Sequence, residues 1–166
     1  MHDRHHPSVI RDLVITVFET NGRLVETGNE LVRHIGLTTA LWQVLAALGY
    51  SPVPLAVAHI ARNMGLTRQA VQRVVDLLVE RGFVGLQPNP HHQRAKLVVL
   101  TPAGRAALDA AEAAEAPLNR AIFDRIGAER IAAAIAVLRE MNDVLAQTSD
   151  TPTVDAVMKK PRKDTV

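Results

Sequence analysis

Apolar side chains recur at intervals of three and four residues along the start of the chain, the spacing of a helix with one apolar stripe. The pattern predicts a long helix over residues 8–35, with its stripe spaced like a coiled-coil seam. A glycine weakens a helix by up to about 1 kcal/mol, so Asn21-Gly22 predicts a bend near residue 22. A seam of this length indicates a partner helix. The stripe consists of Ile10, Val14, Val17, Asn21, Leu24, Gly28, Leu31 and Ile35.

Apolar periodicity with recognisable helix ends predicts five further helices. Thr38 can cap the first of them, and Thr101 followed by Pro102 starts an alanine-rich helix that Pro117 is expected to kink. Residues 148–166 have too little apolar content for a core and are predicted to be disordered. The five helices are predicted over residues 37–49, 56–64, 68–81, 102–126 and 128–147.

The stretch "VAHIARNMGLTRQAVQRVV", residues 57–75, has the pattern of two helices that meet at a steep angle. Such a pair needs a small residue at the close approach, supplied by Ala61, and a residue tolerant of positive φ at the turn, supplied by Gly65. Apolar side chains at fixed offsets then fill the wedge between the helices. These are Ile60, Met64, Leu66, Val71 and Val74. The stretch therefore predicts a helix-turn-helix, with an ordinary helical hairpin as the alternative.

The second helix of this pair has a polar arc concentrated in its N-terminal half. Thr67 is predicted to cap it, and the first turns present only basic and amide side chains. Arginine can bridge guanine and glutamine can bridge adenine in the major groove. An ordinary wet helix face would instead carry charges of mixed sign. The arc, Arg68, Gln69, Gln72 and Arg73 at its start and then Asp76 and Glu80, favours a DNA recognition helix.

Two short runs, "FVGLQP" and "AKLVVLT", are the convincing strand candidates, and the Pro-, Asn- and His-rich stretch between them is a hairpin loop. A hairpin directly after a recognition helix is the wing of a winged helix-turn-helix. Arg94 can enter the minor groove from such a wing, with Lys96 nearer the phosphates. The predicted fold class is mainly α (α+β): a winged helix-turn-helix lobe over about residues 37–101 with flanking N- and C-terminal helices.

Length and composition limit the number of domains and the kinds of chemistry open to the chain. A chain of 166 residues that is 48% hydrophobic predicts a single domain, here residues 1–147. The absence of cysteine excludes disulfides, thiolate metal ligands and thiol redox switches. The start is charged and contains a proline, and no apolar run approaches about 18 residues, so we expect neither a secretory signal nor a membrane span.

Charge is unevenly distributed, although the net charge is only +2. Residues 55–105 hold seven Lys or Arg and two acids, whereas residues 106–147 hold four Lys or Arg and seven acids. This split is typical of a basic lobe that faces a polyanion and a second lobe with another role. A solvated basic face explains it equally well on charge alone.

Three stretches, "HIGLTTALWQVLAAL", "IARNMGLTRQAVQRVVDLLVERGFV" and "HQRAKLVVLTPAG", resemble in order and spacing the MarR family of bacterial winged-helix regulators. The resemblance covers roughly residues 8–147. It implies a wing arginine at Arg94 and a homodimer joined through residues 8–35 and 102–147. It also implies a cleft for a small aromatic or phenolic effector, walled by Trp42, although a lone tryptophan is more often part of the core. The resemblance further implies that four residues face the major groove: Arg68, Gln69, Gln72 and Arg73.

The wing departs from the family pattern. The family usually has Asp, a variable residue and Arg there, whereas this chain has His92, Gln93 and Arg94, and Asn89 stands where an acid is common. An imidazole beside phosphates favours its charged form, so we expect His91 and His92 to contact DNA. The predicted DNA-binding residues are Thr67, Arg68, Gln69, Gln72, Arg73, His91, His92, Arg94 and Lys96.

The histidines also raise the question of a metal site. No carboxylates at helical spacing complete a tetrahedral set around the adjacent histidines of the wing or those at the start of the chain, so no metal is predicted, although His34 and His59 could converge in the fold. No nucleophile with a partnered base, phosphate loop or paired carboxylates is recognisable. We therefore expect no enzyme and no cofactor.

The sequence thus predicts a cytoplasmic, nucleoid-associated homodimer that binds a pseudo-palindromic operator in double-stranded DNA. Its expected role is a ligand-responsive transcriptional repressor. Two alternatives stay open: a winged helix used for protein interaction, and a nucleoid-type binder with little sequence preference. The first would not need Arg68, Arg73 and Arg94 on one side, and the second would not need the two glutamines.

Overall fold

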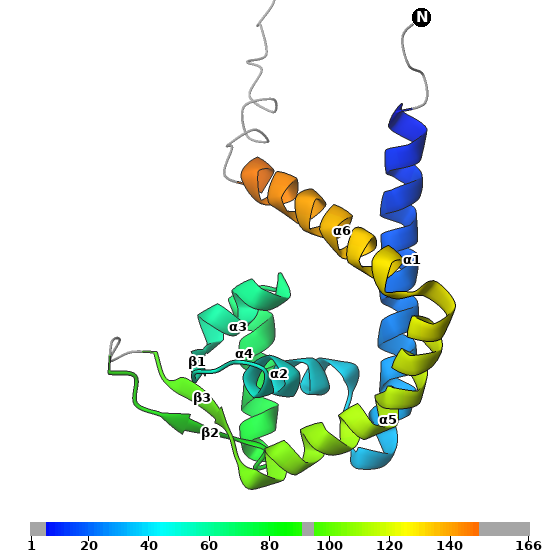
Figure 1. Ribbon diagram of the computed structural model, residues 1–166. Helices are drawn as coiled ribbons and strands as arrows, with labels where there is room; N and C mark the ends of the chain where they lie inside the picture. The colour runs from blue at the N-terminus through cyan, green and yellow to red at the C-terminus, as the bar shows by residue number, and fades with distance from the viewer. Residues whose placement is uncertain (1–5, 91–94, 150–166) are drawn as a thin grey trace, which may run out of the picture. The chain divides into compact units, whose positions relative to one another are not determined.

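The computed structural model describes residues 6–90 and 95–149, which form mainly helices with one small sheet (Figure 1). Helices α1 (His6–Val32), α2 (Thr39–Gly49), α3 (Val57–Met64) and α4 (Arg68–Glu80) are followed by α5 (Pro102–Ile126) and α6 (Ala128–Ser149). A short 3-10 turn, η1 (Arg33–Ile35), follows α1. The strands are β1 (Leu55–Ala56), β2 (Val84–Gln87) and β3 (Leu97–Leu100). The predicted class, a mainly α winged helix-turn-helix with flanking helices, is confirmed.

The sheet is antiparallel with the order β1-β3-β2, so β3 lies in the middle. Strand β1 was not predicted, because the sequence analysis assigned no element to residues 50–55 and began the next helix at residue 56. It pairs with β3 through Leu55 opposite Val98 and Ala56 opposite Leu97. The hairpin of β2 and β3 extends from the helices as the wing (Figure 1).

The chain divides into two compact units, Met1–Pro117 and Leu118–Val166. All of the buried apolar side chains of the described residues lie in the first unit. Its core joins α1, α2 and the helix-turn-helix to β3 and the start of α5. The largest fully buried side chains are Leu45, Ile60, Leu78, Leu108, Val32, Val44, Val71, Val75 and Val98. The single domain over residues 1–147 stays a prediction, as does a kink at Pro117, which lies inside α5 at the boundary of the two units.

Helix α1 continues through Asn21-Gly22, so the glycine costs helix stability without ending the helix. Gly28 has a different role, because a Cβ there would lie 2.6 Å from Thr39 Oγ1. Thr39 donates from its hydroxyl to Val25 O (2.9 Å) and from its N–H to Asn29 Oδ1 (2.8 Å). These contacts fix the corner between α1 and α2, which Gly36 closes in the left-handed conformation.

No single helix in residues 6–90 and 95–149 is both long and apolar enough to cross a membrane; α1 with α2 meets that test only as a pair bent by 83°.

Candidate nucleic-acid interface

The turn between α3 and α4 has the geometry of the predicted helix-turn-helix. Gly65 has φ +63°, and its N–H and that of Leu66 bond back to carbonyls of α3, Leu66 to Ala61 O at 2.9 Å. Thr67 caps α4 by accepting a hydrogen bond from the Ala70 N–H (3.2 Å). Ile60 and Ala61 are buried as expected, but Leu66 is 48% exposed and does not fill the wedge.

Helix α4 turns its apolar side to the core and its polar side to solvent. Val71, Val75 and Leu78 are fully buried, which fixes the rotation of the helix about its axis. The predicted recognition residues are therefore all exposed: Thr67, Arg68, Gln69, Gln72 and Arg73. Leu77, although apolar, is 44% exposed, because it lies toward the polar side of the helix.

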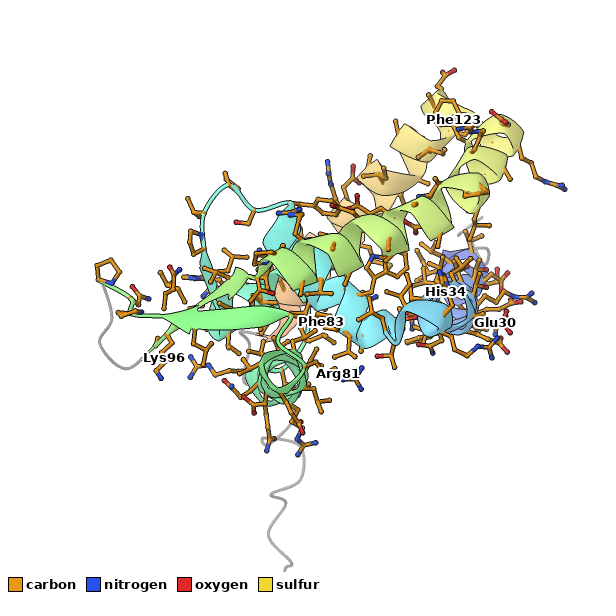
Figure 2. The ribbon with its side chains drawn as sticks, turned by 90° about the horizontal axis from the view of Figure 1, so that it is seen from below. Glu30, His34, Arg81, Phe83, Lys96 and Phe123 are labelled. Carbon is orange, nitrogen blue, oxygen red and sulfur yellow. The ribbon has the colours of Figure 1, made fainter. Side chains whose placement is uncertain are left out.

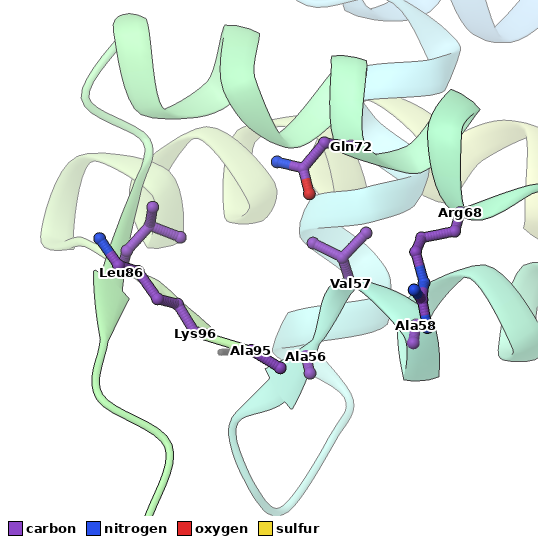
Figure 3. Close-up of a pocket in the computed structure, with 8 residues that line it drawn as sticks. All are labelled: Ala56, Val57, Ala58, Arg68, Gln72, Leu86, Ala95 and Lys96. Carbon is purple, nitrogen blue, oxygen red and sulfur yellow. The ribbon is translucent and has the colours of Figure 1, made fainter. Parts of the chain in front are cut away.

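Helix α4 and the wing bound a shallow depression of about 490 Å³ (Figure 3). Arg68 and Gln72 reach it from α4, and Lys96 reaches it from the wing. None of the residues that line it carries a carboxylate. The rest of the lining is apolar and small, apart from Leu86: Ala56, Val57, Ala58, Leu86 and Ala95. Two cations from separate elements thus share one concave surface, and such a surface suits a polyanion.

One contact on this surface was not anticipated from the sequence. Gln72 Nε2 donates a hydrogen bond to Asp76 Oδ1 (2.7 Å), one turn further along α4. The i, i+4 spacing was a signal for such a contact. Asp76 is thus a candidate functional residue that sequence reasoning placed on the polar arc without a role.

The wing is described only in part. Lys96 is exposed and stands on the wing, whereas Arg81 lies at the end of α4 (Figure 2). His91, His92 and Arg94 lie outside the described residues, so their predicted contacts stay predictions. Within residues 6–90 and 95–149 no group of three His, Cys, Asp or Glu side chains could hold a metal ion. His34 and His59 are both exposed.

Trp42, the predicted effector wall, lies half-buried on α2 against the hydrophobic core. Its Nε1 is buried, and no acceptor among the described residues takes its proton. A buried donor without an acceptor costs about 1 to 3 kcal/mol. Trp42 is therefore a core residue with one polar group left to satisfy.

Comparison with known proteins supports this fold. The model of the MarR family matches residues 35–95, which include the helix-turn-helix. An uncharacterised protein of Mycobacterium tuberculosis, Rv2011c, is 36% identical over 143 residues, covering 86% of this chain and 97% of that protein. The transcriptional activatory protein BadR of Rhodopseudomonas palustris is 30% identical over 95 residues, covering 56% of this chain and 54% of BadR.

Two solved structures share the fold. The M. tuberculosis transcriptional regulator MosR in complex with DNA has a TM-score of 0.67 at 22% identity, with 80% of this chain and 96% of MosR covered. CouR of Rhodococcus jostii bound to p-coumaroyl-CoA has a TM-score of 0.63 at 24% identity, with 87% and 96% covered. With its winged helix-turn-helix and the match of residues 35–95 to the family model, the chain belongs to the MarR family of transcriptional regulators.

Proposed function

We propose that this protein is a homodimeric, ligand-responsive repressor that binds a pseudo-palindromic operator in double-stranded DNA. The observation that carries the proposal is the shared concave surface, which is lined by Arg68 and Gln72 of α4 and by Lys96 of the wing. A helix of this kind enters the major groove, and a two-fold dimer presents two of them to one face of the duplex about one helical turn apart. MosR, solved in complex with DNA, supports the duplex as the partner.

The dimer is supported by the helices that flank the winged lobe. Helix α1 exposes large apolar side chains, among them Ile10 and Phe18, which is 71% exposed. None of residues 118–147 is buried, although α6 carries apolar side chains such as Ile135 and Leu138. A monomer with this much apolar surface would be costly in water, and a second copy is the partner that covers it.

Repression is the sign of regulation that needs the fewest contacts. A dimer that covers an operator overlapping a promoter excludes RNA polymerase without any further contact. Activation needs such a contact, and BadR is described as an activatory protein. Reporter transcription in the presence and absence of the protein distinguishes the two. Duplex DNA as the target implies a cytoplasmic, nucleoid-associated protein.

The test is selection of bound sequences from a random duplex pool, followed by light scattering of the protein alone and in complex. We expect a palindrome with half-site centres about one helical turn apart, bound by two copies of the chain. If the protein binds duplex DNA without enriching any sequence, it is a nucleoid-type binder. If it binds no duplex at all, it is a protein interaction module. A monomer at micromolar concentration would contradict the dimer.

A small aromatic or phenolic effector is the second part of the proposal. It is supported by the unpartnered Nε1 donor of Trp42 and by CouR, which was solved with p-coumaroyl-CoA. Trp42 is the only tryptophan, so its fluorescence reports its own surroundings. Titration with p-coumarate and related phenols should change this fluorescence and release the operator over the same concentration range. Release without a fluorescence change would remove Trp42 from the effector site.

The histidines of the wing give this function a pH dependence. If charged His91 and His92 lie beside phosphates, binding takes up protons and the affinity rises as the pH falls from about 8 to 6. Anisotropy on one operator at fixed salt measures this slope. Replacing both histidines by alanine should remove most of it, whereas Arg94→Ala should weaken binding at every pH. If the variant with both histidines replaced by alanine keeps the full pH dependence of binding, the two histidines make no DNA contact.

A further inference from the structure

An acid lies beside the surface that should meet a polyanion, one turn along α4 from Gln72. Asp76 and Glu80 are the only acids in residues 55–105, and both lie on the exposed side of α4. A carboxylate near phosphates opposes binding through charge repulsion. Asp76 therefore lowers affinity for any duplex, and its presence on this side needs another physical reason.

The reason lies in its hydrogen bond with Gln72. The distance from Gln72 Nε2 to Asp76 Oδ1 is 2.7 Å, and an ionised carboxylate only accepts hydrogen bonds. The amide of Gln72 must then turn its nitrogen toward Asp76, because the reverse orientation would set Oε1 against a carboxylate oxygen. Asp76 thus chooses between the two orientations that a free glutamine adopts about equally.

The fixed amide presents a definite pattern to a partner. One N–H is used by Asp76, so Oε1 and the second N–H are left. Gln72 extends from α4 over the depression that Arg68 and Lys96 also line (Figure 3). In the major groove adenine offers one donor, N6–H, and one acceptor, N7, whereas guanine offers two acceptors, O6 and N7. One acceptor beside one donor matches adenine and sets Oε1 against guanine O6.

We propose that Asp76 is a positioning residue that makes Gln72 select adenine over guanine. This inference rests on the proposed function, since it requires α4 in the major groove. The repulsion between Asp76 and the phosphates is the cost of this selectivity, and it acts on matched and mismatched duplexes alike. Specificity is the difference between the affinities for matched and mismatched duplexes. A residue can therefore raise specificity while it lowers both affinities.

The test uses the full-length protein and the operator obtained from the random pool. Gln72→Ala first identifies the base pair that Gln72 reads, as the one where the preference is lost. At that pair the ratio of adenine to guanine affinity is then measured by anisotropy for the Asp76 variants. Asp76→Ala should lower the ratio about tenfold, because the amide is free to turn over, and should raise the affinity for random duplex.

Three controls separate orientation from charge. Asp76→Asn should lower the ratio as alanine does, since its amide can donate as well as accept. Asp76→Glu keeps a group that only accepts and should restore the ratio. Glu80→Gln removes the same charge from the same helix and should raise the overall affinity without changing the ratio.

The outcomes are separable. An unchanged ratio in Asp76→Ala and Asp76→Asn, in a protein that binds its operator selectively, overturns this inference alone. An equal loss in Glu80→Gln also overturns it, because the cause is then charge. In the Gln72→Ala background, Asp76→Ala should leave the ratio unaltered, and any change there contradicts a role through Gln72. A wild-type protein that selects no duplex overturns the proposed function and this inference together.

Discussion

Tyr50, at the end of α2, shows how a single side chain reports on packing within the first unit. A hydrogen bond with the Glu112 carboxylate raises the pKa of Tyr50 above its ordinary value of 10.0, and desolvation and the charges of Glu112 and Glu115 raise it further. The native phenol therefore keeps its proton at a pH where an unfolded chain loses it. Its contribution to stability is complete below about pH 10 and is lost as the pH rises through the native pKa.

Tyr50 is the only tyrosine, so ultraviolet absorbance of the tyrosinate follows it directly. We expect the native midpoint to lie above the midpoint in denaturant. Glu112→Gln should bring it down most of the way, because the hydrogen bond to the carboxylate is the largest cause. Glu115→Gln, which removes only a charge, should have the smaller effect. Equal effects of the two changes would contradict the hydrogen bond.

Arg73, exposed on α4, gives a residue-scale test of base reading. Arg73→Ala should lose about 1 to 3 kcal/mol of binding free energy on the operator and less on random duplex, because a base contact exists only on the matched sequence. The measurement is anisotropy on both duplexes at equal salt. Equal weakening on the two would show that Arg73 touches phosphates only.

At this scale the sequence predicted which side chains face solvent, since helical periodicity decides it once α4 packs on the core. Thr67, Arg68, Gln69, Gln72 and Arg73 are exposed for that reason. Periodicity does not decide how side chains of one face bond to one another. The contact between Gln72 and Asp76 depends on rotamers, and it was missed.

Between elements, Thr101 joins the wing to α5. Its hydroxyl lies 2.7 Å from Gly82 O and accepts from the Gly104 N–H at 3.0 Å, while its own N–H donates to Phe83 O at 3.1 Å. Gly104 is required beside it, because a Cβ there would meet the Phe83 carbonyl. The "LTPAG" stretch is thus a joint between the turn after α4 and the start of α5.

Thr101→Val keeps the shape of the side chain and removes the hydroxyl contacts with Gly82 O, Phe83 O and the Gly104 N–H. It should lower the free energy of unfolding by about 1 to 3 kcal/mol, the range for a lost cap together with an unsatisfied group. Thr101→Ser keeps the hydroxyl and should cost well under half of that. Urea unfolding of the two variants against wild type measures the difference. A valine variant as stable as the serine one would exclude the hydroxyl as the stabilising group.

The helices and the hairpin were predictable because each has a local signal: a stripe, a cap or a glycine. Strand β1 has none, since it is two residues long and its partner β3 lies more than forty positions further along the chain. Helix α1 continues through Gly22, because a propensity cost of about 1 kcal/mol is too small to end a long helix, and a bend at that residue stays a prediction.

For the whole molecule, the first unit has a core and the second has none of its own among the described residues. This contrast explains why the sequence predicted the winged lobe well but left the assembly to the family resemblance. Burial within one chain does not report what a second chain covers. The dimer must therefore be tested by measurements made over a range of protein concentrations.

Phe18→Ser should shift the protein toward the monomer, since Phe18 is the most exposed of the large apolar side chains on α1. The wild-type unfolding temperature should rise with protein concentration, because assembly stabilises the native state by mass action, and the variant should lose most of this dependence. Its affinity for the full operator should fall about 100-fold or more, as two half-sites are no longer bound together.

Val53→Ser, which removes a similarly exposed apolar side chain from the connector before β1, should change neither property. A Phe18→Ser protein that stays dimeric in light scattering would take α1 out of the dimer interface, while equal losses in Val53→Ser would point to a general loss of stability.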